Sequence, residues 1–266
     1  MSEEYGDLLN YNRKAWNAQV REKNRWTIPV SVDQIENARK GQWEIILTPQ
    51  KPVPRNWFPN FSEQSYKVLC LASGGGQQGP ILAAAGADVT VFDNSDEQLN
   101  QDRLVAERDG LTIRLEQGDM RDLSRFEDDF FDLIFHPCSN CFVENILPVW
   151  NESFRVLKPG GHLLSGFTNP VRYMFDDDLL QQKELEVKFT IPYSDTSSIS
   201  QEQKEKYIHT NEPCCFGHTL TDQIGGQLDA GFLLVDFFED SYEDDDELSK
   251  YIQTFIATRA MKPRSS

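Results

Sequence analysis

The residues best suited to chemistry in this chain are a run of glycines and an acidic side chain about 17 residues beyond it. Gly74, Gly75 and Gly76 follow the apolar run 68–71, and a second apolar run ends at Asp93. Glycine permits backbone conformations and close approaches that a Cβ atom would block. In a β-α-β unit, Asp93 would lie beside the glycine loop at the carboxyl edge of a parallel sheet, where it can accept hydrogen bonds from a ribose diol. The spacing therefore predicts an adenosine-containing cofactor.

Two kinds of adenosine cofactor fit this loop. The segment 74–79 matches G-x-G-x-x-G, the dinucleotide fingerprint, so a nicotinamide-dependent oxidoreductase on a Rossmann core is one alternative. Short-chain dehydrogenases normally carry Tyr-x-x-x-Lys, and none of the eight tyrosines has a lysine four residues later. Asp119, at the end of a third expected strand, is placed to accept a hydrogen bond from an adenine amino group. These features disfavour the oxidoreductase.

Two histidines are the candidate catalytic residues. His136 ends the fourth expected strand, where it could contact the cofactor or act as a base towards an acceptor hydroxyl. A histidine bonded only to local backbone is an equally open interpretation of His136. His218 precedes a segment with helical character and could face the substrate, although a helix-entry role is the more ordinary interpretation.

The cysteines do not form a convincing metal site. Cys138 and Cys141 could combine with Cys214, Cys215 and His218, but this is not zinc-ribbon spacing, and we predict no metal. Five cysteines make an odd number, which fits reduced thiols in the cytoplasm. The acidic stretch 239–247 lacks a ligand-spacing pattern and is interpreted as a solvated loop.

Alternating elements must position these residues. Strands are expected at 67–71, 88–92, 112–117, 131–135 and 162–167, and helices at 79–85, 97–109 and 145–156. Such alternation predicts a parallel sheet covered on both faces, with ligands at the carboxyl ends of its strands. The tail predicts a helix at 221–230, a strand at 232–238, a helix at 247–251 and a last strand at 254–259.

Two further regions flank this core. Residues 1–60 contain four of the five tryptophans and are predicted to form an N-terminal helical cap, in which Tyr11, Trp16 and Arg21 are candidate substrate residues. Residues 61–266 are predicted to form the main domain, with a less regular insertion near 168–216. In that insertion, Arg172 and Tyr173 are placed to line an acceptor pocket.

Together these motifs resemble the class I S-adenosylmethionine-dependent methyltransferases, especially the small bacterial type, over roughly residues 60–260. The matching segments, in the family's order, are 68–76, 91–95, 118–120 and 156–161. The resemblance implies an α/β fold with a Rossmann-like, mostly parallel seven-stranded sheet whose last strand is antiparallel. It also implies S-adenosyl-L-methionine as cofactor, with Asp93 on the ribose, Asp119 on the adenine amine and Met120 against the ring. The other residues implied at the cofactor are Ala72, Ser73, Gly74, Gly76, Asn94 and His136.

Two positions depart from the family's pattern. Cys70 stands where the family usually has an acidic residue, and Ala72 stands where it usually has the first glycine. Alanine is a mild change there if its φ stays negative. The missing carboxylate keeps open a second alternative, a protein that binds the cofactor without turnover.

The acceptor is expected to be a small molecule, with its O, N or C atom unresolved. A net charge of −17 and a pI near 4.6 disfavour a nucleic-acid substrate. The segment 136–139, His-Pro-Cys-Ser, also lacks the Asp/Asn-Pro-Pro-aromatic motif of methyltransferases that modify nucleobase amines. No run of 18 apolar residues is present, and the acidic first residues predict no secretory signal, so we expect a cytoplasmic protein without a membrane partner. The oligomeric state stays open.

Overall fold

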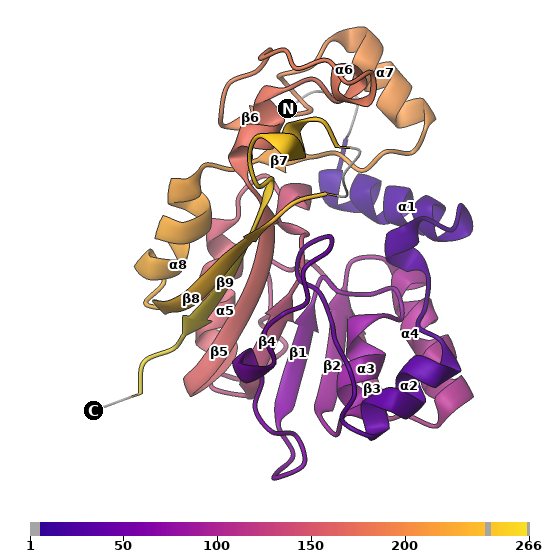
Figure 1. Cartoon of the computed structure of the whole chain (residues 1–266), viewed down its shortest axis with the longest axis vertical. Helices are drawn as coiled ribbons and strands as arrows, with labels where there is room; N and C mark the ends of the chain where they lie inside the picture. The colour runs from indigo at the N-terminus through magenta and orange to yellow at the C-terminus, as the bar shows by residue number, and fades with distance from the viewer. Residues whose placement is uncertain (1–5, 243–245, 265–266) are drawn as a thin grey trace.

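A mostly parallel sheet forms the centre of the computed structural model, which describes residues 6–242 and 246–264 (Figure 1). Within those ranges the main sheet has seven strands in the order β3-β2-β1-β4-β5-β9-β8. The first five pair in parallel, and β9 runs antiparallel to both β5 and β8. This confirms the predicted Rossmann-like sheet with an antiparallel last strand. The strands are β1 (Lys67–Leu71), β2 (Asp88–Asp93), β3 (Ile113–Gln117), β4 (Phe131–His136), β5 (Leu157–Thr168), β8 (Leu233–Asp240) and β9 (Phe255–Met261).

The apolar side chains of β1 are buried on both faces of the sheet. Side chains alternate between the two faces of a strand, so a strand buried on both sides is apolar throughout. Val68 and Cys70 pack into one apolar cluster, whereas Leu69 and Leu71 pack into the other. All four are fully buried.

Helices cover both faces of the sheet. On one face, α2 (Val32–Arg39), α3 (Gln78–Ala84) and α4 (Asp96–Asp109) contribute buried residues to the cluster that contains Val68. On the other face, α5 (Leu147–Val156) buries Trp150 beside the strands, and α8 (Gly226–Asp229) contacts α5. The predicted α/β architecture with helices on both faces is therefore confirmed.

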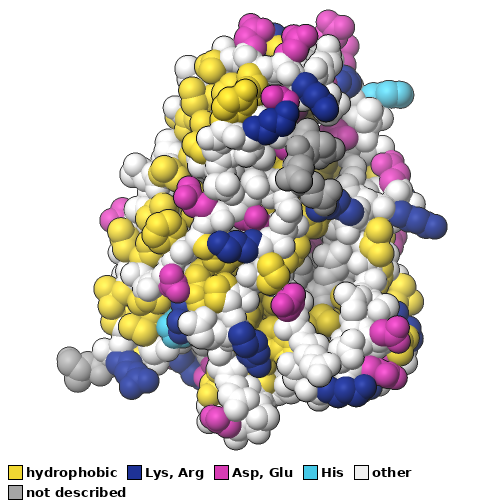
Figure 2. All heavy atoms as spheres, viewed as in Figure 1, with side chains coloured by type: hydrophobic (Ala, Val, Ile, Leu, Met, Phe, Trp, Pro, Cys, Tyr) yellow, Lys and Arg dark blue, Asp and Glu magenta, His cyan; other side chains and the backbone are white. Residues whose placement is uncertain are grey.

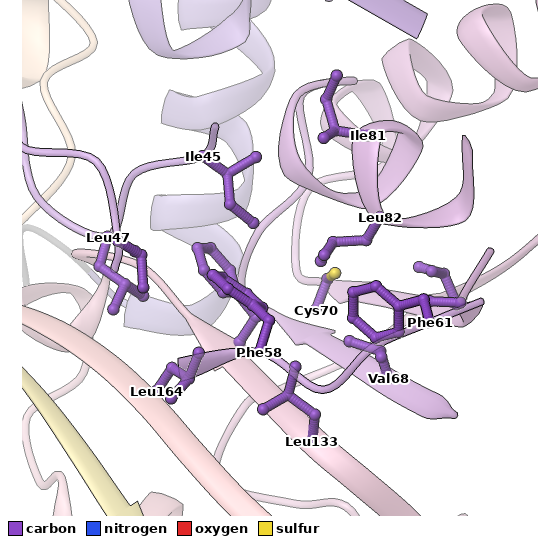
Figure 3. Packing of buried hydrophobic residues seen from close by; sticks show 14 of the residues in the cluster. Ile45, Leu47, Phe58, Phe61, Val68, Cys70, Ile81, Leu82, Leu133 and Leu164 are labelled. Carbon is purple, nitrogen blue, oxygen red and sulfur yellow. The ribbon is translucent and has the colours of Figure 1, made fainter. Parts of the chain in front are cut away.

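The segment between α2 and β1 covers the part of the first face that these helices leave open. Figure 3 shows Leu47, Phe58 and Phe61 from this segment facing strand residues such as Leu133 and Leu164. The backbone comes so close that a Cβ atom on Gly166 of β5 would clash with the carbonyl oxygen of Leu47. Most of the segment proposed as a cap thus packs on the sheet as part of the core.

The first helix of the proposed cap, α1 (Leu8–Arg21), lies above the carboxyl ends of the strands (Figure 1). The insertion lies beside it and contains α6 (Asp177–Gln181), β6 (Tyr193–Ser194), α7 (Gln201–His209) and β7 (Phe216–Gly217). Buried Asn12 joins the two, because its Nδ2 donates to the carbonyl oxygen of Cys214 at 3.1 Å and its Oδ1 accepts from the Cys214 amide at 2.8 Å.

Several element boundaries differ from the sequence predictions. The segment 158–161 is not a separate turn before the fifth strand. It interrupts β5 as an irregularity between the pairs Leu157–Phe131 and His162–Leu133. The predicted helix 247–251 is a single 3-10 turn, Leu248–Lys250. The acidic stretch 239–247 falls partly outside the described residues, since 243–245 are not among them. No helix in the described ranges is long and apolar enough to span a membrane.

Candidate functional site

The glycine loop between β1 and α3 is held by two carboxylates from other elements. The amide of Gly74 donates to Oδ2 of Asp93, at the end of β2, across 2.9 Å. The amide of Gly75 donates to Oδ2 of Asp102, within α4, across 3.0 Å. Together the two hydrogen bonds hold the loop at the carboxyl edge of the sheet.

Asp102 is a residue that the sequence reasoning missed. It is fully buried, and burial raises the pKa of its carboxyl to about 8. Burial is the main cause that raises the pKa of the Cys70 thiol, and the charge of nearby Asp102 is the second cause. A carboxylate from α4 thus stands near the position where the sequence has lost an acidic residue. The signal was present in the buried face of α4, where Leu99, Asp102 and Val105 recur at a spacing of three.

The backbone at Ala72 corrects one expectation. Its φ is +47°, in the left-handed region, whereas the alanine was expected to be tolerated with a negative φ. Only glycine adopts this conformation without steric cost. The amide of Ala72 donates to the carbonyl oxygen of Phe92 at 2.7 Å, a contact that helps to hold it in place. The substitution of the family's first glycine is therefore strained rather than neutral.

Asp93 and Asn94 connect the loop to the helix above it. Besides Gly74, Asp93 binds the amide of Ser95, which donates to Oδ1 at 2.8 Å. Burial raises the pKa of Asp93, and its backbone amide donors oppose that rise. Asn94 Nδ2 donates to the carbonyl oxygen of Leu9 at 2.8 Å and so fixes the start of α1 over this corner.

The predicted adenine residues lie next in the chain after β3. Asp119 forms a two-pronged ion pair with Arg121, whose Nη2 lies 2.7 Å from Oδ2. The carboxylate that was expected to bind the adenine amine is therefore already shared with a guanidinium. Met120 is largely buried beside it, in the cluster that contains Leu69.

A cavity of about 640 Å³ runs from the glycine loop to the insertion. It brings together most of the residues singled out from the sequence, which come from five separate parts of the chain. The predicted site residues that line it are Trp16, Ala72, Ser73, Gly74, Asp93, Asn94, Asp119, Met120, Arg172 and Tyr173.

The two histidines do not line this cavity. His136 is fully buried behind it: its Nδ1 donates to the carbonyl oxygen of Leu71 at 2.9 Å, and its Nε2 lies 2.5 Å from Oδ1 of Asn140. Burial lowers the pKa of His136. His218 is also buried, with Nε2 3.0 Å from the carbonyl oxygen of Asn140. A base for a bound acceptor must reach the cavity, and this geometry instead makes both rings supports of the loop after β4.

Three other predicted residues also lie outside the cavity lining. Gly76 packs against α4, where an added Cβ would lie 2.9 Å from the carbonyl oxygen of Gln101. The hydroxyl of Tyr11 donates to the carbonyl oxygen of Glu212 at 2.9 Å, so this residue ties α1 to the insertion. Arg21 is exposed in the last turn of α1.

The cysteines remain free thiols in the structure. Cys138, Cys141 and Cys215 line the cavity, but no group of three or more His, Cys, Asp or Glu residues in the described ranges could hold a metal ion.

Comparison with known proteins identifies similar chains. Residues 69–165 match the model of a family described as a methyltransferase domain. The chain is 55% identical over 255 residues to the uncharacterized methyltransferase YbaJ of Bacillus subtilis (strain 168), covering 96% of this chain and 98% of that protein. It is 33% identical over 102 residues to the sterol 24-C-methyltransferase erg6 of Aspergillus fumigatus, covering 37% and 27% of the two chains. The fold resembles that of an S-adenosylmethionine-dependent methyltransferase from Mesorhizobium loti, with a TM-score of 0.56, 17% identity, and 78% and 94% coverage of this chain and of that one.

Proposed function

This chain belongs to the class I S-adenosylmethionine-dependent methyltransferases, and from that premise we propose that it methylates a small molecule enclosed in the cavity between the glycine loop and the insertion. The observation that carries the proposal is the continuity of that cavity. The same space is lined by Gly74 and Asp93 at one end and by Arg172 and Tyr173 at the other. A cofactor and a small acceptor could therefore meet in it.

The residues present fit S-adenosylmethionine. Asp93 lines the cavity beside the glycine loop, and its oxygens retain further lone pairs for ribose hydroxyls. Gln98 supports the same end: its side chain lines the cavity, and its Oε1 is buried without a hydrogen-bond partner in the structure. A buried orphan acceptor is costly unless a ligand donates to it. Met120 offers an apolar contact for the adenine ring.

When bound, the cofactor supplies a methyl group on a positively charged sulfur, which is already activated for displacement. The protein then has to align the acceptor and exclude water. The glycine loop, held by Asp93 and Asp102, fixes one side of the reaction space. The helix α1 and the insertion, joined through Asn12, close it from above.

Charge favours a small acceptor over nucleic acid. The chain carries −17, and Figure 2 shows acidic side chains at the top of the molecule, around α6 and α7. A phosphate backbone approaching the cavity from that side would be repelled. The free cysteines are consistent with a reducing compartment, and we place the enzyme in the cytoplasm.

The two alternatives raised by the sequence lose their support. Family membership favours methyl transfer over nicotinamide-dependent oxidation. Asp102 also places a buried carboxyl group at the loop, which weakens the argument that the absence of an acid at Cys70 abolishes turnover.

Calorimetric titration of the ligand-free protein with S-adenosylhomocysteine, with NAD in parallel, tests the cofactor half of the proposal. Micromolar binding of S-adenosylhomocysteine alone is expected. Turnover of a metabolite panel, measured as S-adenosylhomocysteine formation, tests the acceptor half. Binding of NAD alone, or methylation only of RNA or DNA, would overturn the proposal.

A further inference from the structure

The charged side chains in the outer part of the cavity indicate a class of acceptor. We define the acceptor chamber as the part of the cavity lined by residues 168–255. Among the described lining residues, five carboxylic acids face two cationic side chains. The acids are Asp176, Asp177, Asp178, Asp195 and Glu212, and the cations are Arg172 and Lys206.

Both cations already have partners among the acids. Arg172 Nη1 lies 3.0 Å from Oδ1 of Asp246, and its Nη2 lies 3.4 Å from Oδ1 of Asp177. Lys206 Nζ lies 2.6 Å from Oδ1 of Asp178. The chamber therefore keeps an excess of negative charge after its own ion pairs are formed.

Asp195 is the acid most affected by this excess of negative charge, because it is the most deeply buried of the five. Its side chain lines the cavity although the residue is only 3% exposed. Its carboxylate accepts from two neutral donors, the hydroxyl of Tyr193 at 2.6 Å and the amide of Cys215 at 2.6 Å. Burial, helped by the charges of Asp177 and Glu212, raises the pKa of Asp195 to about 6, although its hydrogen bonds from Tyr193 and Cys215 oppose the rise. A buried carboxylate without a cation is costly, and a positively charged ligand would remove that cost.

Aromatic rings form the other part of the chamber wall. Tyr173 and Tyr193 are stacked, with their centroids 5.4 Å apart and their planes at 25°. Phe189 packs edge-on against Tyr193 at 5.3 Å. The faces of aromatic rings attract cations, most strongly where water is excluded. Aromatic side chains beside a carboxylate that accepts only from neutral donors suit an organic cation and disfavour an anion.

We propose that the acceptor is a small organic amine, which binds in the acceptor chamber as its ammonium ion against Asp195 and the adjoining Tyr173–Tyr193 pair. This inference rests on the proposed function. The ammonium ion first transfers a proton to the Asp195 carboxylate. The freed nitrogen lone pair then forms a bond to the methyl carbon while the carbon–sulfur bond breaks, and that bonding pair stays on sulfur. The products are S-adenosylhomocysteine and a methylated ammonium ion, and Asp195 returns its proton to water.

Two probes of the same shape isolate the effect of charge. Choline carries a quaternary ammonium group, and 3,3-dimethylbutan-1-ol places a neutral carbon at the same position. We would titrate each into the full-length protein, with and without saturating S-adenosylhomocysteine. Choline is expected to bind at least about 10-fold more tightly than the alcohol. Asp195→Asn should reduce that ratio at least threefold. Asp177→Asn, at a side chain that is 60% exposed, should also reduce it and leave the fold intact.

Asp229→Asn is the matched control, because this exposed residue of α8 does not line the cavity. It should leave the ratio unchanged. Choline binding no tighter than the alcohol would overturn the amine inference, as would a ratio unaffected by both chamber variants.

A turnover panel separates this inference from the proposed function. It contains amines together with the alcohol and the carboxylic acid of each same carbon skeleton. Methylation confined to the amines supports the inference. Methylation of alcohols or acids, but not of amines, would leave the proposed function standing and overturn the amine acceptor. Failure of S-adenosylhomocysteine to bind would instead overturn the proposed function, whatever choline does.

Discussion

The amide of Gly74 donates to Oδ2 of Asp93 across 2.9 Å, so the carboxylate assigned to the cofactor ribose also anchors the glycine loop. The two residues lie on different elements, one after β1 and the other at the end of β2, which pair in parallel. A change at Asp93 should therefore affect both ligand contacts and loop geometry.

Asp93→Ala is expected to weaken S-adenosylhomocysteine binding by about 1.5–3 kcal/mol, the scale of charge-assisted hydrogen bonds. Calorimetry on the folded variant measures the loss. Asp88→Ala, at the exposed beginning of the same strand, is the control and should bind normally. Unchanged affinity in folded Asp93→Ala would contradict the ribose assignment.

Asp119→Ala should weaken binding by less than Asp93→Ala, because the Asp119 carboxylate is already shared with Arg121. The loss should disappear with a cofactor analogue that has an unsubstituted purine, since that ring lacks the amino group. A comparison of the two ligands on wild type and variant, again by calorimetry, measures this. An equal loss with both ligands would show that Asp119 does not recognise the amine.

Ala72→Gly should stabilise the protein by about 0.5–1 kcal/mol, because the present φ of +47° is strained for alanine and relaxed for glycine. Urea unfolding with an unchanged m-value measures the difference. Ala83→Gly, within α3, is the opposite control and should destabilise by a similar amount. If Ala72→Gly is as destabilising as the control, the left-handed conformation is not a source of strain.

Asp102 should make the protein less stable as pH rises. Its pKa is raised to about 8 by burial, whereas an unfolded aspartate titrates near pH 4. Between these values the folded state binds the additional proton, so the free energy of unfolding falls with pH, by at most about 1.4 kcal/mol per unit. The contribution is complete below about pH 4 and is lost as pH passes 8.

Asp102→Asn removes this titration, so the difference in Tm between pH 6 and pH 8 should become smaller than in the wild type. Asp229→Asn should retain the wild-type difference. If Asp102→Asn retains it as well, Asp102 is not the titrating group.

Much of the core could be predicted because its signals are local. The apolar runs that became β1 and β2, and the glycines between them, each reflect the packing of a few consecutive residues. Their order along the chain placed Asp93 and Asp119 at the carboxyl edge, where both line the cavity. The boundaries near Lys158 and Leu248 were less accurate, because a strand irregularity and a single helical turn depend on neighbouring strands and loops.

The sheet, the glycine loop and the family could all be predicted from the amino-acid sequence, since these follow from periodicity and from motifs at short spacing. Three features emerge from the folded structure alone: Asp102 accepts a hydrogen bond from the glycine loop, His136 does not line the cavity, and Asp195 lines the same cavity as that loop. Each of these depends on contacts between segments far apart in the chain, such as Asn12 with Cys214. Such contacts follow from how whole elements pack, and side-chain periodicity within one element does not encode them.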